Sequence, residues 1–210
     1  MAHQTLDRRI VKTRAALQRA LIQLAVERGY DEVTVQDVAD RADVSRSSFY
    51  AHYADKDDLL AASISNLKQG MVHRWRESLT AGAERGSLAF AGPLLRHIDE
   101  GRPIWHALTR GRSAAVLDRE FRKMVAELAV ADLRLGGRPE VVREAACASV
   151  VGSFMAVVGA WMDGRIEADA AEMERLYLGL VLPGLAAIAA EPGSGGPTPG
   201  KPRPTRETQR

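Results

Sequence analysis

One stretch of the chain, residues 34–56 (TVQDVADRADVSRSSFYAHYADK), contains most of the side chains whose types and spacing point to a specific chemistry. Arg46 can donate two hydrogen bonds to the edge of a guanine base. Ser47 and Ser48 are short, so a helix that carries them can lie deep in the major groove of a DNA duplex. This combination favours hydrogen bonding to base edges.

Side chains suited to phosphate oxygens surround this group. Tyr50, His52 and Lys56 carry hydrogen-bond donors of the kind that contact the DNA backbone. Thr34 and Gln36 stand at the start of the preceding segment, where they can reach a phosphate and a base edge respectively. The stretch therefore offers donors for both parts of a duplex.

Two short helices must position these side chains. Thr34 precedes the first helix, which we expect over Val35 to Ala42, and Ser45 precedes the second, which we expect from Arg46 to about His52. Serine and threonine at such positions cap helix N-termini. A tight break joins the two helices, which is the arrangement of a helix-turn-helix.

The rest of the chain shows helical periodicity and no run with the strict alternation of a half-buried strand, which predicts an all-α fold. Phe49 and Tyr53 are expected to point inward and to hold the second short helix on this bundle. The other expected helices run from about Leu6 to Arg28, Lys56 to Thr80, Leu88 to Glu100, Pro103 to Thr109, Ser113 to Leu135, Pro139 to Asp163 and Ala168 to Ala190. Pro183 is expected to bend the last of them.

The composition limits the classes of protein to consider. The chain has 210 residues and a formal net charge of +2, which excludes a polybasic arm and an acidic disordered chain. Cys147 is the single cysteine, which excludes an internal disulfide framework and a cysteine-rich zinc site. The first residues, MAHQTLDRR, lack the apolar segment of a signal peptide, so we expect a cytoplasmic location.

Two segments need separate interpretation. Ala145 to Met162 carries no charge, but it is rich in Ala, Gly and Ser, and no second span of equal length follows it. We therefore expect a buried helix and no membrane span. Residues 191–210 contain no aromatic residue, Leu, Ile or Val, so they cannot bury enough apolar surface to fold and should form a disordered tail.

The run Phe49-Tyr50-x-His52-Tyr53-x-x-Lys56-x-x-Leu59-Leu60, after Val44-Ser45-x-Ser47-Ser48, resembles the DNA-binding domain of the TetR family of one-component regulators. The resemblance covers about residues 8–60. It implies an N-terminal helix-turn-helix domain at 1–55, a helical ligand-binding and dimerisation domain at 56–190, and the tail at 191–210. One departure is Asp43, where the family often has a small residue or glycine in the turn.

The resemblance implies a function and a set of contacts. The expected function is a transcriptional regulator, a repressor that a small-molecule ligand releases from a palindromic double-stranded DNA operator. The residues implied as base contacts are Gln36, Arg46, Ser47 and Ser48, and those implied as phosphate contacts are Thr34, Tyr50, His52 and Lys56. No cofactor, metal or enzymatic activity is implied.

The resemblance also implies a homodimer that forms through the last two helices. Ala148, Gly152, Ala156 and Ala160 recur every fourth residue, which allows close approach of two backbones. The alternative is that these helices form a core within one chain. A ligand pocket is expected among the middle helices, although side chains of these types are more often ordinary core than ligand contacts. The candidates are Trp75, Trp105, Phe121, Met124, Phe154, Met155 and Trp161.

Two other classes of protein were weighed. A helical enzyme is disfavoured because the sequence contains neither a G-x-S-x-G nor an H-E-x-x-H motif. An all-α ligand-binding or adaptor protein that has lost DNA binding stays open, because residues 1–60 carry nine Lys or Arg and ten Asp or Glu. Any positive surface for DNA must therefore be local. The sequence specifies neither the ligand nor the operator.

Overall fold

The computed structural model describes residues 2–66, 88–133, 135 and 137–190, and the side chains from residue 8 onward. Every regular element in these ranges is a helix, which confirms the predicted all-α class. The helices are α1 (Ala2–Arg28), α2 (Val35–Arg41), α3 (Arg46–Tyr50), α5 (Ala91–Glu100), α6 (Arg102–Leu108), α7 (Ser113–Asp132), α8 (Glu140–Met162) and α9 (Ala170–Ala190), and residues 56–66 are also helical.

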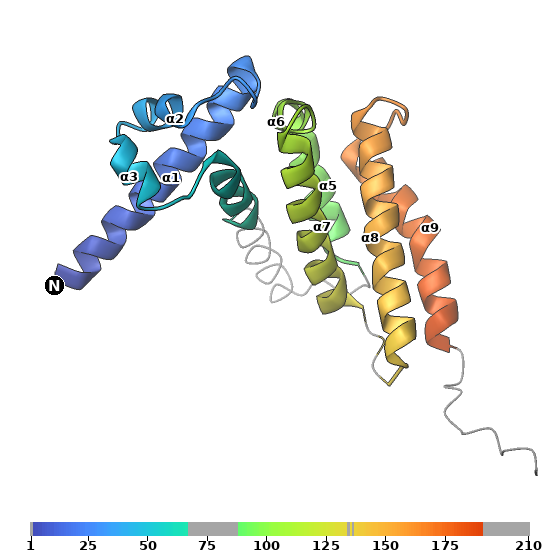
Figure 1. Cartoon of the computed structure of the whole chain (residues 1–210). Helices are drawn as coiled ribbons and strands as arrows, with labels where there is room; N and C mark the ends of the chain where they lie inside the picture. Colours follow the sequence, from blue (N-terminus) through green and yellow to red (C-terminus); the bar gives the residue numbers. More distant parts are fainter. Residues whose placement is uncertain (1, 67–87, 134, 136, 191–210) are drawn as a thin grey trace, which may run out of the picture.

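The N-terminal helices α1 to α3 lie on one side of the molecule, and α5 to α9 form a bundle on the other (Figure 1). The helix over residues 56–66 leaves α3 towards this bundle. Trp75, predicted to line a pocket, and the predicted tail at residues 191–210 both lie outside the described residues.

Helix α3 is shorter than predicted. We expected it to continue to about His52, but it ends at Tyr50, and Ala51 is its C-cap. The amide of His52 bonds the carbonyl oxygen of Phe49 at 2.9 Å, an i to i−3 contact that tightens the last turn. Only five residues therefore make up this helix, and they start at Arg46 as predicted.

The N-terminal helices share one hydrophobic core. Leu17 and Leu21 of α1 and Phe49 of α3 are fully buried, and Tyr53 is 5% exposed. The inward orientation predicted for Phe49 and Tyr53 is therefore confirmed. The same buried cluster continues into Leu108 of α6 and into α7.

This continuity affects the predicted domain boundary between residues 55 and 56. Leu59 and Leu60, which follow that boundary, are fully buried in the cluster of the N-terminal helices. Val116 and Leu117 of α7 also belong to this cluster. The packing is continuous across residues 55 and 56. The division into 1–55 and 56–190 therefore stays a prediction.

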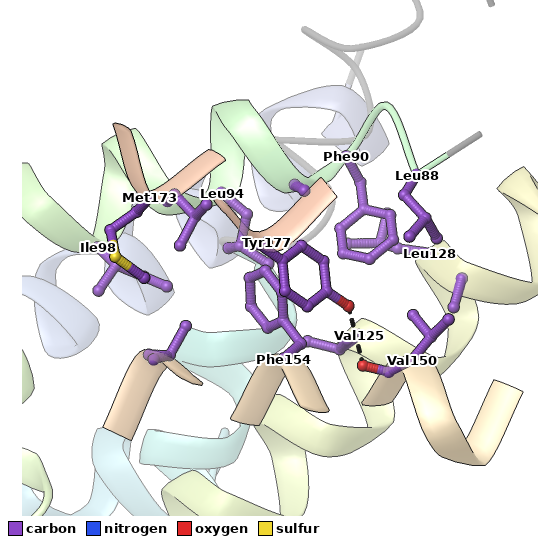
Figure 2. Close-up of a cluster of buried hydrophobic side chains, with 14 of the residues drawn as sticks. Leu88, Phe90, Leu94, Ile98, Val125, Leu128, Val150, Phe154, Met173 and Tyr177 are labelled. Atoms are coloured by element: carbon purple, nitrogen blue, oxygen red, sulfur yellow. Dashed lines mark hydrogen bonds between the residues drawn. The ribbon is translucent and has the colours of Figure 1, made fainter. Parts of the chain in front are cut away.

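A second core holds the C-terminal helices together. Phe154 of α8 packs edge-on against Tyr177 of α9, with ring centroids 5.2 Å apart, and lies 5.7 Å from Phe90 (Figure 2). The Tyr177 hydroxyl donates a hydrogen bond of 3.0 Å to the carbonyl oxygen of Val150. Burial raises the pKa of Tyr177, so its proton is retained for this bond.

Helix α5 takes its N-terminal cap from a distant part of the chain. No side chain near its start caps it. Instead, the amide of Phe90 donates a 3.2 Å hydrogen bond to the carboxylate of Asp132, the last residue of α7. Asp132 is 8% exposed, so the Phe90 amide takes the place of a water molecule that would otherwise bind its carboxylate.

As expected, no uncharged run of equal length follows Ala145 to Met162, because the longest one after it, residues 176–190, is shorter. Both α8 and α9 are long and apolar enough to cross a membrane by length and composition alone. The reason is that α9 carries its few charges in its first two turns, which leaves an apolar helix after them. Helix α8 buries Phe154 and Trp161, whereas most of α9 is exposed.

The turn between α2 and α3 contains a left-handed residue. Asp43 has a φ of 53°, and the amide of Val44 closes the turn on the carbonyl oxygen of Ala39 at 3.0 Å. Glycine adopts this backbone freely, and aspartate tolerates it better than β-branched residues do. Asp43, singled out in the sequence analysis, is therefore a residue that can adopt the left-handed backbone of this turn.

We expect Asp43→Val to lower the free energy of unfolding by about 1–2 kcal/mol, because a β-branched residue is strained at positive φ. Asp43→Gly, the matched control at the same position, should equal or exceed the wild type. Urea unfolding followed by circular dichroism measures both. Equal stability of the two variants would contradict the importance of the left-handed backbone.

Candidate nucleic-acid interface

The short helix α3 is held in place from beneath. Phe49 is fully buried and meets the ring of Tyr50 edge-on, with centroids 5.4 Å apart. The ring centroids of Tyr53 and Phe49 are 6.1 Å apart. The Tyr53 hydroxyl accepts a hydrogen bond of 3.1 Å from the side-chain amide of Gln18 in α1. These contacts fix which side of α3 faces solvent.

The opposite side of α3 presents polar groups to solvent. Arg46 and Ser47 are exposed, and Ser48 is half-buried. The Arg46 guanidinium lies 5.6 Å from the centroid of the Tyr50 ring, and its Nη2 is 3.4 Å from the Tyr50 hydroxyl. Tyr50 is 49% exposed, so the arginine and the tyrosine form one preoriented polar surface.

Ser45 caps α3 as predicted. Its hydroxyl accepts a 3.1 Å hydrogen bond from the amide of Ser48 and lies 2.9 Å from the hydroxyl of Ser47. The cap stabilises a helix that has too few residues to be stable alone. It also fixes the Ser47 hydroxyl beside the helix N-terminus.

Thr34 caps α2 as predicted, and with Asp37 it forms a capping box. The Thr34 amide and hydroxyl donate to the Asp37 carboxylate at 2.8 and 2.6 Å, and the Asp37 amide donates to the Thr34 hydroxyl at 3.2 Å. Arg28 pairs with the same carboxylate at 2.9 Å. The Thr34 hydrogen bonds, together with Arg28, lower the pKa of Asp37 to about 2.

Gln36 is exposed in the first turn of α2. Its side-chain amide donates a 2.7 Å hydrogen bond to Asp40, which orients the amide along the helix. Thr34 is exposed as well. His52 is half-buried, with its ring 6.4 Å from that of Tyr53.

The structure does not group Lys56 with these exposed donors. Its ammonium donates to the carbonyl oxygens of Tyr30 at 2.8 Å, Val33 at 2.9 Å and Asp31 at 3.3 Å. It also lies 4.4 Å from the centroid of the Tyr30 ring. Desolvation lowers the pKa of Lys56, and the nearby carboxylates of Asp31 and Asp57 oppose that shift.

The helix-turn-helix has further supports that the sequence patterns did not indicate. Arg41 at the end of α2 makes a two-pronged ion pair with Glu27 of α1, at 2.8 and 2.7 Å. The Tyr30 hydroxyl donates to Asp57 at 2.5 Å. Both pairs join residues at least 14 positions apart, so neither helical spacing nor a local motif reveals them.

Two of the seven predicted pocket residues line a cavity. Trp105 and Phe121 face an apolar cavity of about 230 Å³. The rest of its lining comes from five helices that meet only in the fold. These residues are Ile22, Ser63, Ile64, His97, Ile98, Gly101, Ile104, Leu108 and Leu117.

Four other predicted pocket residues lie elsewhere. Met124 and Phe154 are buried in the C-terminal core, and Met155 packs half-buried against it. Trp161 is 1% exposed and donates its indole N–H to the carbonyl oxygen of Ala168 at 2.8 Å. The core alternative therefore describes the surroundings of these residues better than the pocket does.

A larger groove of about 850 Å³ lies between α7 and α8, and none of the predicted pocket residues lines it. Its floor is apolar and includes Val130 and Val151. Charged residues stand along it, among them Lys123 and the ion pairs Arg122–Asp118 and Arg143–Glu140.

The surfaces of α8 and α9 leave apolar residues uncovered. Leu176 and Leu180 of α9 are 48% and 75% exposed. A side chain added at Gly152 of α8, or at Gly179 or Gly184 of α9, would meet only open space. Small residues and exposed leucines thus occur together on the two last helices.

Comparison with known proteins gives consistent matches to one group. The profile of the family described as bacterial regulatory proteins, tetR family, matches residues 17–63. An uncharacterized HTH-type transcriptional regulator, YxbF of Bacillus subtilis (strain 168), is 42% identical over 60 residues, which cover 28% of this chain and 16% of that protein. The match thus spans about a sixth of the length of that curated relative.

Solved structures extend the likeness over most of the chain. A TetR transcriptional regulator from Streptococcus agalactiae 2603V superposes with a TM-score of 0.60 at 25% identity, covering 85% of this chain and 98% of that one. FadR of Thermus thermophilus, a TetR family transcriptional repressor in complex with lauroyl-CoA, gives a TM-score of 0.58 at 23% identity, covering 90% and 100%. The second likeness establishes the shared fold alone.

The capping box generates a prediction about acid. Because the pKa of Asp37 is about 2 in the folded chain and 3.8 without these contacts, its stabilisation is complete above pH 3.8 and disappears as the pH falls towards 2. Asp37→Asn should therefore be less stable than wild type at pH 7, and the two should converge near pH 2. Urea unfolding at a series of pH values measures this difference. A gap that stays constant down to pH 2 would contradict it.

Proposed function

We propose that this chain is a member of the TetR family of bacterial regulatory proteins and a transcriptional regulator that binds an operator in double-stranded DNA. One observation carries the proposal: α3 buries Phe49 completely while it exposes Arg46 and Ser47. A helix anchored on its inner side with a polar outer side fits the major groove.

Within this proposal, Gln36, Arg46, Ser47 and Ser48 contact base edges. Arg46 is the strongest candidate, because the Tyr50 ring already orients its guanidinium. An oriented fork loses less freedom when it donates two hydrogen bonds to guanine. The exposure of Gln36 and the oriented hydroxyl of Ser47 support the same assignment.

Thr34, Tyr50 and His52 are proposed to contact phosphates directly. Lys56 is proposed to contribute mainly by fixing the loop before α2, because three carbonyl oxygens already bind its ammonium. A phosphate would have to share that ammonium with them. Such backbone contacts set the register on the duplex, whereas the base contacts set sequence preference.

We propose that the protein acts as a homodimer through α8 and α9. The exposed Leu176 and Leu180 would be buried in such an interface. The open space above Gly152 and Gly179 would let helices of the second copy approach closely. A twofold dimer places two copies of α3 on successive major grooves of a palindrome, about 34 Å apart.

The proposed function includes release by a small ligand, so that the protein acts as a repressor. The cavity beside Trp105 and Phe121 is apolar, and Ser63 and His97 supply polar groups at its wall. This lining suits a small, largely apolar molecule. A ligand that binds one arrangement of the two halves more tightly lowers DNA affinity by linkage.

The proposal assigns no catalytic activity to the chain and places it in the cytoplasm with the DNA. The apolar lengths of α8 and α9 are assigned to the dimer, and no part is assigned to a membrane. Glycine and alanine along the uncovered faces agree with helix-to-helix packing between two copies.

Arg46→Ala should reduce the preference for operator over random DNA by about 1–3 kcal/mol, which is about 5- to 150-fold, because one two-pronged base contact is lost. Operator fragments are first selected from the genome of origin, and affinities are then measured by fluorescence anisotropy at two salt concentrations. Arg96→Ala is the matched control, since Arg96 is an exposed arginine of α5 paired with Glu174. An unchanged preference in Arg46→Ala would contradict the placement of α3 in the major groove.

Leu180→Glu should weaken dimerisation at least about tenfold, because the interface would bury a charge in place of an apolar side chain. Stability of the monomer should change little, since Leu180 is 75% exposed within one chain. Sedimentation velocity over a concentration series measures the monomer–dimer equilibrium. Val11→Glu on α1, at a position 65% exposed, is the control and should stay dimeric. A dimer as tight as wild type in Leu180→Glu would place the interface elsewhere.

A further inference from the structure

Helix α7 begins without a cap of its own. It has no acidic residue in its first turn, and no neighbouring side chain caps it. The carboxylate of Asp31, in the loop between α1 and α2, accepts the amide of Arg112 with both oxygens, at 3.2 and 3.3 Å. A residue 81 positions earlier in the chain therefore supplies the negative charge that a helix N-terminus favours.

The turn before α7 is shaped around this carboxylate. Gly111 has a φ of +67°, which favours glycine, and a side-chain carbon added to it would overlap the Asp31 carboxylate. Ser113 is fully buried, and its hydroxyl donates to the carbonyl oxygen of Arg110 at 3.0 Å. The position of Asp31 therefore depends on both the shape and the residue types of this turn.

The loop that carries Asp31 is fixed on its other side. Lys56 binds three carbonyl oxygens of residues 30–33, and the Tyr30 hydroxyl binds Asp57. Both contacts attach the loop to the start of the helix over residues 56–66. The same loop leads directly into Thr34, the cap of α2. A displacement of Asp31 is thus passed to the helix-turn-helix.

The turn that Asp31 holds joins two of the five helices that wall the small cavity. Trp105 and Leu108 of α6 and Leu117 and Phe121 of α7 line it. Residues 109–112 form the turn that links α6 to α7 directly. Asp31 binds that turn at Arg112.

We infer that Asp31 is a positioning residue that couples the α6–α7 turn to the loop before α2, so that the arrangement of the cavity walls and that of the helix-turn-helix depend on each other. The inference rests on the proposed function for its biological meaning, although the contact itself does not. Each side biases the other because the carboxylate bonds one turn while Lys56 and Asp57 hold its loop.

Amide hydrogen exchange of the full-length protein, followed by mass spectrometry, tests the coupling without any ligand. Asp31→Ala should speed exchange in peptides that cover residues 108–120 about tenfold or more, since a hydrogen bond to a charged acceptor is lost. Asp31→Asn keeps a carbonyl acceptor and should show a smaller effect in the same direction. It replaces the alanine variant in the test if that variant folds poorly. Glu32→Ala, the neighbouring exposed carboxylate, is the matched control and should exchange as wild type does.

The decisive variant is Gly111→Ala, which disturbs the contact from the side of α7. It should speed exchange at residues 31–44 of the distant loop and α2 by about fivefold or more. Wild-type exchange there would overturn the inference, as would equal effects of Asp31→Ala and Glu32→Ala at residues 108–120. Circular dichroism confirms that each variant is folded.

A second measurement separates this inference from the proposed function. Operator DNA should change exchange at residues 104–121 in the wild type, and Asp31→Ala should bind DNA without that change. A wild type that binds no DNA would overturn the proposed function, and the Gly111→Ala result would still decide the coupling. If operator DNA changes exchange at residues 104–121 as much in Asp31→Ala as in the wild type, the coupling is overturned and the proposed function is not.

Discussion

The packing of Phe49 is the interaction on which the candidate DNA-binding surface depends. Helix α3 has five residues, too few for a stable helix in isolation, so tertiary contacts must hold it. The buried ring of Phe49, the Tyr53 contacts and the Ser45 cap together fix its rotation. Because a helix exposes the side opposite its buried one, this anchor also decides that Arg46 and Ser47 face solvent.

Helix N-termini capped from a distance connect helices that are far apart in the sequence. Asp132 bonds the amide at the start of α5, and Asp31 bonds the amide at the start of α7. A local cap would stabilise each helix equally well but would connect nothing. A cap supplied from elsewhere makes the position of one helix depend on another.

The uncovered face of α9 imposes a different constraint. A helix that is apolar on most sides needs cover on more than one of them, and within one chain α9 buries few of its residues, among them Met173 and Tyr177. The exposed leucines and the open space above the glycines are therefore explained most simply by a second copy. The proposed dimer would also account for a twofold-symmetric operator.

The sequence by itself determined the helical class, the capped starts of α2 and α3, and the inward turn of Phe49 and Tyr53, because these follow from local spacing and local hydrogen bonds. Tertiary structure alone decided where Lys56 binds, which residues wall the cavity and what caps α7. The contacts of Lys56 and the cap of α7 join positions 23 to 81 residues apart, which periodicity cannot relate. The end of α3 at Tyr50 also differed from expectation. Local patterns specify elements, whereas the pairing of distant charges and surfaces is fixed only when the elements pack.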